Sequence, residues 1–202
     1  RFSEKREVYD HRRRELLGQI GVRDFRVLSP DVDERTQPGL SPAQMVEELS
    51  LRKARAAAEK AGPGGLIIAA DTVVALDGAV LGKPQDEEDA FAMLSALSGR
   101  EHHVYTGVTL LRDGRAATGH EQTAVRFRAL EPQEIRGYIA TGEPMDKAGA
   151  YGIQGVGALL VEGIRGDYCN VVGLPVFRLG RMLAQLGISL LPAPQNKEQS
   201  KA

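Results

Sequence analysis

The stretch from Gly65 to Pro84 constrains the fold more than any other part of the chain. It opens with a short apolar run, 66–70, whose length and composition are typical of a buried strand. A second β-rich run, 73–76, meets Asp77-Gly78, the dipeptide that favours a tight hairpin turn. The chain then returns through 79–81. The stretch therefore predicts a buried strand that leads into a hairpin.

A single acid, Asp71, ends the first apolar run, and Lys83 follows the hairpin. Asp71 either closes the strand or carries a carboxylate out of the core toward a functional site, because an acid at a strand end suits both roles. The neighbouring residues leave the two alternatives open.

Helical and strand patterns elsewhere in the chain indicate an α/β protein. The helices are expected over 12–20, 42–60, 86–97, 131–141 and 176–186, and the further strands over 25–28, 102–111 with a hairpin partner to 128, and 158–164. We expect a single domain over residues 1–191. The polar, proline-containing segment 192–202 is predicted to be a disordered tail.

Composition narrows the classes of partner. The charges nearly cancel, at a formal net charge of −1, which argues against a nonspecific nucleic-acid coat or a polybasic membrane contact. The single cysteine, Cys169, excludes an intramolecular disulfide and suits a reducing compartment. No apolar run has the length needed to cross a bilayer. We therefore expect a cytoplasmic protein, and a small, highly charged substrate is compatible with this composition.

Several polar segments suit either a binding site or solvent exposure. Three arginines at 12–14 stand at a predicted helix start, where cations oppose the helix dipole unless an anion is bound. The acidic loop 31–34 either binds a divalent cation or is solvated, and Lys53 on its own is typical of a surface lysine. The glycine-rich section 141–157 either approaches a ligand or forms a flexible loop.

The adjacent histidines, His102 and His103, do not predict a metal site. Neighbouring side chains on a strand point to opposite faces, so the two rings cannot converge on one ion. We expect them to be structural or exposed. Cys169 likewise has no neighbour in the sequence that marks it as a nucleophile.

Taken in order, a set of short motifs resembles the Maf family of nucleoside triphosphate pyrophosphatases. The resemblance covers residue 12 to about 190. Its Asp-Thr pair after the apolar run and its YGIQG segment are similar to the branch that acts on dTTP and UTP. It rests on Arg12-Arg13, Asp33-Glu34, Lys53, Ala70-Asp71-Thr72, Gly82-Lys83-Pro84, GEPMDKAGAYGIQG at 142–155 and NVVGLP at 170–175.

The resemblance implies an elongated mixed β-sheet flanked by helices, with two lobes and a deep nucleotide-binding cleft, as in inosine triphosphate pyrophosphatase. Cleavage between the α and β phosphorus atoms needs cations, a divalent metal and a carboxylate that orients or deprotonates water. The roles it implies are Asp71 as general base and metal ligand, Glu34 as second ligand of Mg²⁺ or Mn²⁺, Arg12, Arg13, Lys53 and Lys83 on the phosphates, Gln154 on a pyrimidine edge, and Thr72 in support of Asp71.

Residues 1–11 depart from the family pattern. Family members open with an apolar strand that ends in Ser-x-Ser-Pro-Arg-Arg, whereas this chain has Val8-Tyr9-Asp10-His11 before Arg12. Val8 removes a hydroxyl donor, and Asp10 places negative charge beside a triphosphate. Two functions stay open: a pyrophosphatase that acts on dTTP, UTP or modified pyrimidine triphosphates, and a catalytically weak nucleotide-binding regulator of septum formation. The oligomeric state, including a homodimer, stays open as well.

Overall fold

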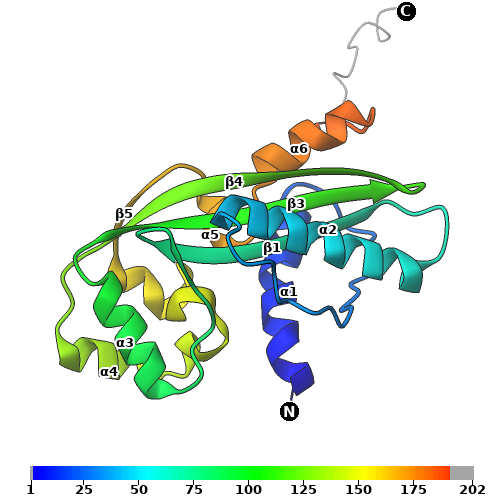
Figure 1. Ribbon diagram of the computed structural model, residues 1–202. Helices are drawn as coiled ribbons and strands as arrows, with labels where there is room; N and C mark the ends of the chain where they lie inside the picture. Colours follow the sequence, from blue (N-terminus) through cyan, green and yellow to red (C-terminus); the bar gives the residue numbers. More distant parts are fainter. Residues whose placement is uncertain (1, 192–202) are drawn as a thin grey trace, which may run out of the picture.

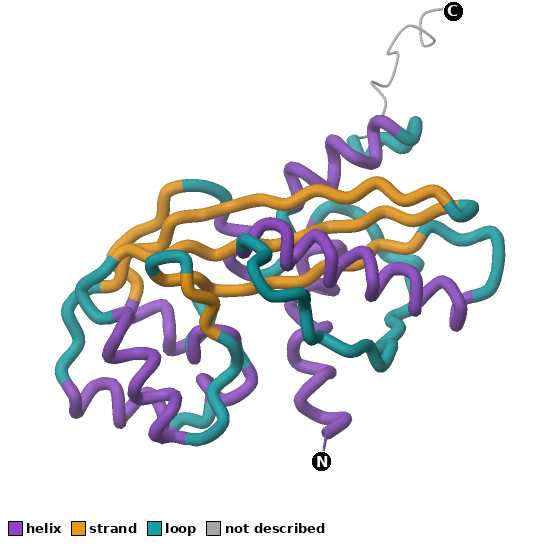
Figure 2. The backbone as a smooth tube through the Cα atoms, in the orientation of Figure 1, coloured by secondary structure: helices purple, strands orange, loops and turns teal. Residues whose placement is uncertain are grey.

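The computed structural model describes residues 2–191, and the side chains from residue 11 onward, so the tail predicted at 192–202 lies outside the described residues. Figures 1 and 2 show an elongated sheet flanked by helices. The elements are α1 (Phe2–Gln19), α2 (Pro42–Ala61), β1 (Ile67–Leu76), β2 (Ala79–Leu81), α3 (Glu87–Leu97), β3 (Glu101–Arg112), β4 (Arg115–Phe127), α4 (Pro132–Ala140), the 3₁₀ turns η1 (Glu143–Asp146), η2 (Ala148–Ala150) and η3 (Gly155–Leu160), β5 (Val161–Arg165), α5 (Tyr168–Val172) and α6 (Val176–Gln185).

The sheet has five strands in the order β2-β1-β3-β4-β5. The expected α/β class is confirmed, but every neighbouring pair is antiparallel, where a mixed sheet was expected. The N-terminal segment, which the resemblance assigned to an apolar strand, is instead the start of α1. Its many charges cannot be buried in a sheet, and a helix satisfies its backbone without a partner strand.

β1 runs without a break through Asp71, which corrects the expectation that this acid ends a strand. Asp71 lies opposite Gly107 of β3, and its neighbours Ala70 and Thr72 are paired in the same register. The hairpin turn at Asp77-Gly78 is confirmed, with φ of 51° and 82° at the two residues. Asp71 therefore lies in mid-strand, on a rigid ladder of backbone hydrogen bonds.

The two faces of the sheet carry different helices. In β3, the Thr106 hydroxyl donates to the Asn170 carbonyl of α5, whereas the next residue, Gly107, faces the backbone of Val46 in α2. Successive strand residues point to opposite faces, so α2 and α5 cover opposite faces. The start of α2 follows from its sequence, because the Ser41 hydroxyl accepts from the Gln44 amide while the Gln44 side chain accepts from the Ser41 amide.

Two separate hydrophobic cores divide the fold into the expected two lobes. One core joins α3 and α4 to β3 and β4 through residues such as Leu94, Phe127 and Ile135. The other joins α1 and α6 to the opposite end of the sheet through Leu16 and Leu179. Figure 1 shows α3 and α4 gathered near one end of the sheet and α6 extending toward the other. No helix among residues 2–191 is long and apolar enough to cross a membrane.

Two predicted strands differ from the structure. Residues 25–28 form no strand, and they belong to a segment, 22–41, that has neither helix nor strand. Of the strand expected at 158–164, only 161–164 forms, as part of β5 (Val161–Arg165), because the preceding Gly155–Leu160 is a 3₁₀ turn. Short apolar runs are ambiguous between these states when no partner strand is known.

His102 is fully buried, as a structural histidine was expected to be, and its Nε2 lies 2.8 Å from the Tyr151 hydroxyl. Burial, with a smaller effect of His103, lowers the pKa of His102 to about 4. In the unfolded chain the His102 ring therefore binds a proton below about pH 6.5, whereas in the folded protein it binds one only below about pH 4.

We expect His102 to lower the free energy of unfolding by about 1 kcal/mol per pH unit as pH falls from 6 to 4. Urea unfolding of the wild type and of His102→Gln over this range measures the effect, because the variant lacks the titrating ring. Equal slopes in the two proteins would show that His102 contributes nothing to the pH dependence.

Candidate functional site

Lys53 of α2 joins the two acids that the sequence singled out. Its Nζ lies 2.5 Å from Asp71 Oδ1 and 2.8 Å from Glu34 Oε1. The Asp71 side chain is 11% exposed and that of Glu34 is 62% exposed, so the cluster reaches from the sheet to the surface. Burial favours the neutral amine, but Asp71 and then Glu34 outweigh it and raise the pKa of Lys53. Lys53 is thus a charged, structurally fixed group rather than a solvated surface lysine.

A hydrogen-bonded chain fixes Arg13 beside this cluster. Arg13 Nε donates to the Gly173 carbonyl at 2.8 Å, and Nη2 donates to the Thr72 hydroxyl at 3.3 Å. Thr72 and Thr106 share a hydrogen bond of 2.9 Å, and Thr106 donates its only proton to the Asn170 carbonyl. Thr72 must therefore donate to Thr106 and accept from Arg13. In the structure Thr72 therefore supports Arg13, and its expected support of Asp71 stays a prediction.

A cavity of about 310 Å³ borders the Lys53 cluster. Its polar lining contains four of the sequence-predicted site residues, and the remainder is largely apolar, from 25–32 and from the start of β1. The four are Arg13, Glu34, Lys53 and Lys83. The cavity therefore combines cationic and carboxylate groups with an apolar lining, as a site for a charged small molecule requires.

Arg12 and Thr72 line a second, much smaller cavity of about 20 Å³ with Gly152 and Lys147. Lys147 is buried and donates to Asp146 Oδ1 and to the Glu143 carbonyl. Lys147 has no signal of its own in the sequence, because only the fold brings it beside Arg12. The hydrogen bond from Arg13 to Thr72 connects the linings of the two cavities.

The structure does not place Gln154 in the lining of either cavity. The adjacent loop is nevertheless firmly held by Glu143, whose carboxylate accepts from the amides of Val156 and Gly157 at 3.0 and 3.1 Å and from the Tyr138 hydroxyl at 2.9 Å. The glycine-rich section is therefore an anchored structure rather than a flexible loop. Glu143 was another residue that sequence reasoning missed.

The expected metal ligands, Glu34 and Asp71, fit a divalent cation that also binds substrate. They already share one cation, the Lys53 ammonium. Among the described residues there is no group of three or more histidines, cysteines and acids that could hold a metal. Mg²⁺ is commonly held by one or two carboxylates with phosphate oxygens and water, so a pair suffices if the substrate supplies the other oxygens.

A family profile and several named relatives match most of this chain. The profile of a family described as "Maf-like protein" matches residues 11–186. A dTTP/UTP pyrophosphatase of Symbiobacterium thermophilum is 53% identical over 176 residues, which cover 87% of this chain and 90% of the relative. Proteins of the same name from Moorella thermoacetica and Pelotomaculum thermopropionicum are 52% and 50% identical over 182 residues, covering 89% of this chain and 92% and 94% of the relatives.

Proposed function

This chain belongs to the Maf family, and we propose that it is an enzyme that hydrolyses dTTP and UTP to the nucleoside monophosphate and pyrophosphate. The observation that supports this most directly is the contact of Lys53 with both Asp71 and Glu34 beside a cavity that Arg13 and Lys83 also line. Relatives named dTTP/UTP pyrophosphatase are about half identical to it over most of their length.

In the proposed mechanism, the chain's cations bind the triphosphate and Asp71 acts on water. Arg13 has its guanidinium plane fixed by Gly173 and Thr72, so it offers phosphate a preoriented fork. Lys53 and Lys83 act as compact charges on the tail. A carboxylate oxygen of Asp71 orients a water and takes one of its protons as the water oxygen attacks a phosphorus of the α–β linkage. The bond from that phosphorus to the bridging oxygen breaks, and the bridging oxygen leaves with the other product. Arg12 extends the cationic lining toward Gly152.

The family suggests that a divalent metal is required, and we propose Mg²⁺ or Mn²⁺. Glu34 and Asp71 would hold it, and when bound it would neutralise the oxygens of the triphosphate. Gln154 keeps its proposed role at the pyrimidine edge, because its neighbours Gly152 and Ile153 line the smaller cavity. A cytoplasmic location, a homodimer and the lack of nucleic-acid or membrane partners stay predictions.

The purified protein with Mg²⁺ or Mn²⁺ is expected to release pyrophosphate from dTTP and UTP faster than from purine triphosphates. A panel of nucleotides, with pyrophosphate and orthophosphate measured separately, tests this. Release of orthophosphate alone would contradict cleavage between the α and β phosphorus atoms. Tight nucleotide binding with no release would instead favour the alternative, a catalytically weak regulator of septum formation.

A further inference from the structure

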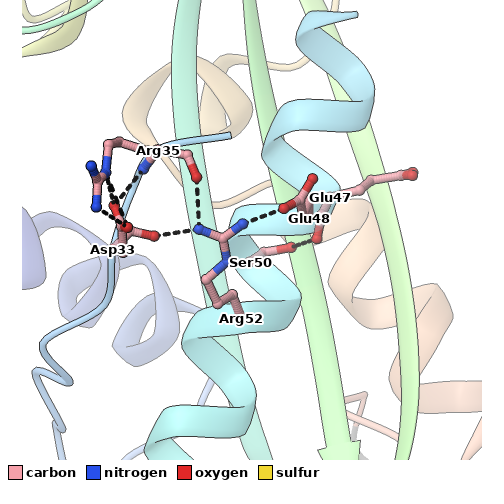
Figure 3. Close-up of polar contacts among 6 residues, drawn as sticks. All are labelled: Asp33, Arg35, Glu47, Glu48, Ser50 and Arg52. Atoms are coloured by element: carbon pink, nitrogen blue, oxygen red, sulfur yellow. Dashed lines mark hydrogen bonds and ion pairs between the residues drawn. The ribbon is translucent and has the colours of Figure 1, made fainter. Parts of the chain in front are cut away.

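Arg52, next to Lys53 on α2, contacts the loop that carries Glu34. Its Nη1 donates to the backbone carbonyls of Asp33 and Arg35, the latter at 2.9 Å, and its Nη2 contacts the Glu48 carboxylate one helical turn earlier. Figure 3 shows the guanidinium between the loop and the helix. Arg52 therefore attaches the loop to α2 through backbone carbonyl oxygens, which are present whatever the side chains of the loop.

The two carbonyls that Arg52 binds stand on either side of Glu34. Lys53 binds the Glu34 carboxylate itself, at 2.8 Å. Two consecutive residues of α2 thus hold one short segment. Arg52 binds the backbone of the segment, and Lys53 binds the Glu34 side chain. A planar guanidinium spans two acceptors with one rigid group, which a lysine ammonium on a flexible stem does not do.

This support matters because Glu34 lies outside any helix or strand. Residues 22–41 contain no helix or strand, and the Glu34 side chain is 62% exposed. Asp33 is bound by the side chain and amide of Arg35, which stiffens the segment locally but does not attach it to the rest of the fold. Arg26 and Lys60 attach earlier residues of the segment to α2, through the Ala61 and Ser29 carbonyls. Next to Glu34, the contacts with α2 are those of Arg52 and Lys53.

We propose that Arg52 is a positioning residue that holds the carboxylate of Glu34 beside Lys53 and Asp71. The proposal rests on the proposed function, in which Glu34 helps to bind the divalent cation and the triphosphate. Arg52 touches no reacting atom. Its effect on catalysis therefore passes through Glu34 and vanishes when Glu34 lacks its charge.

Two measurements on Arg52→Ala test this. The first is the rate of tryptic cleavage after Arg35, followed by mass spectrometry, which reports release of the loop without depending on activity. It is expected to rise about tenfold. The second is kcat/KM for dTTP in the wild type, Arg52→Ala, Glu34→Gln and the double variant. Loss of Arg52 is expected to lower it about tenfold when Glu34 is present, and by less than about twofold in Glu34→Gln.

Arg55→Ala is the matched control, since Arg55 is an exposed arginine on the same helix. It is expected to match the wild type in both measurements. Arg52→Lys, which keeps the charge, is expected to fall between the wild type and Arg52→Ala, and it replaces Arg52→Ala if that variant fails to fold.

Unchanged cleavage after Arg35 would overturn the proposal, and so would an equal loss of kcat/KM with and without the Glu34 charge. If the wild type releases no pyrophosphate, the proposed function fails by that result alone. The cleavage rate then still decides whether Arg52 holds the Glu34 segment.

Discussion

Asp71→Asn is expected to lower kcat for pyrophosphate release from dTTP by a factor on the order of 10³, because an amide cannot take the proton of the attacking water. The substitution keeps the shape of the side chain. It removes one anion from beside a bound triphosphate, so binding of dTTP without metal is expected to be as tight as in the wild type or tighter. Steady-state kinetics and calorimetric titration with dTTP in the presence of a chelator measure the two effects.

Asp77→Asn is the matched control for this substitution. Asp77 is the first residue of the turn between β1 and β2, its φ is 51°, and asparagine tolerates that conformation. Its ion pair with Arg100 is exposed and worth little. Asp77→Asn should therefore keep the wild-type kcat. If Asp71→Asn retained more than a tenth of it, Asp71 would not be the general base.

The position of Asp71 shows where sequence reasoning reached its limit. An acid after an apolar run is typical of a strand end, because an unpaired charge within a buried strand is costly. Here the strand continues, since Lys53 from α2 neutralises the acid at 2.5 Å. That contact joins residues 18 positions apart across two elements, and no local pattern encodes it.

Elements with local signals were predictable. The helix expected from residue 42 and the hairpin expected after 102–111 both formed. Each depends on a local signal, the Ser41 cap in the helix and the Asp113-Gly114 turn in the hairpin. The two hairpin pairs were predictable, but the antiparallel pairing of β1 with β3 and of β4 with β5 was not, because it joins strands that no tight turn connects.

The residues of the candidate site show the same difference between those with a sequence signal and those without one. Four charged residues named from the motifs line one cavity: Arg13, Glu34, Lys53 and Lys83. They could be predicted because their types and their order along the chain form a recognisable pattern. The groups that hold them were missed. Arg52 acts on backbone carbonyls, and Thr106 continues a hydrogen-bonded chain from a different strand. Neither interaction leaves a pattern in the sequence.

One residue that supports the site, Gly107, does have a sequence signal, because it is a glycine inside the strand predicted at 102–111. A glycine in a strand often marks the close approach of another backbone. A Cβ at Gly107 would lie 2.1 Å from the Val46 carbonyl oxygen and 2.4 Å from its carbon, both in the backbone of α2. Gly107 also faces Asp71 across the sheet. The absence of a side chain here thus sets how closely α2, and with it Lys53, approaches β1.

Gly107→Ala is therefore expected to lower the free energy of unfolding by about 3 kcal/mol or somewhat more, at the upper end of overpacking effects, because backbone cannot rotate away as a side chain does. It should also reduce kcat/KM, since moving α2 away from the sheet lengthens the distance from Lys53 to Asp71. Urea denaturation and dTTP kinetics measure the two losses.

Gly137→Ala is the matched control, because a Cβ at this position in α4 meets no atom within 4 Å. Alanine in a helix interior is expected to stabilise the protein by about 0.5–1 kcal/mol and to leave kcat/KM unchanged. Should Gly107→Ala instead be as stable and as active as the wild type, the close contact between α2 and β3 would not be what places Lys53 against Asp71, and the site would depend on the ion pair alone.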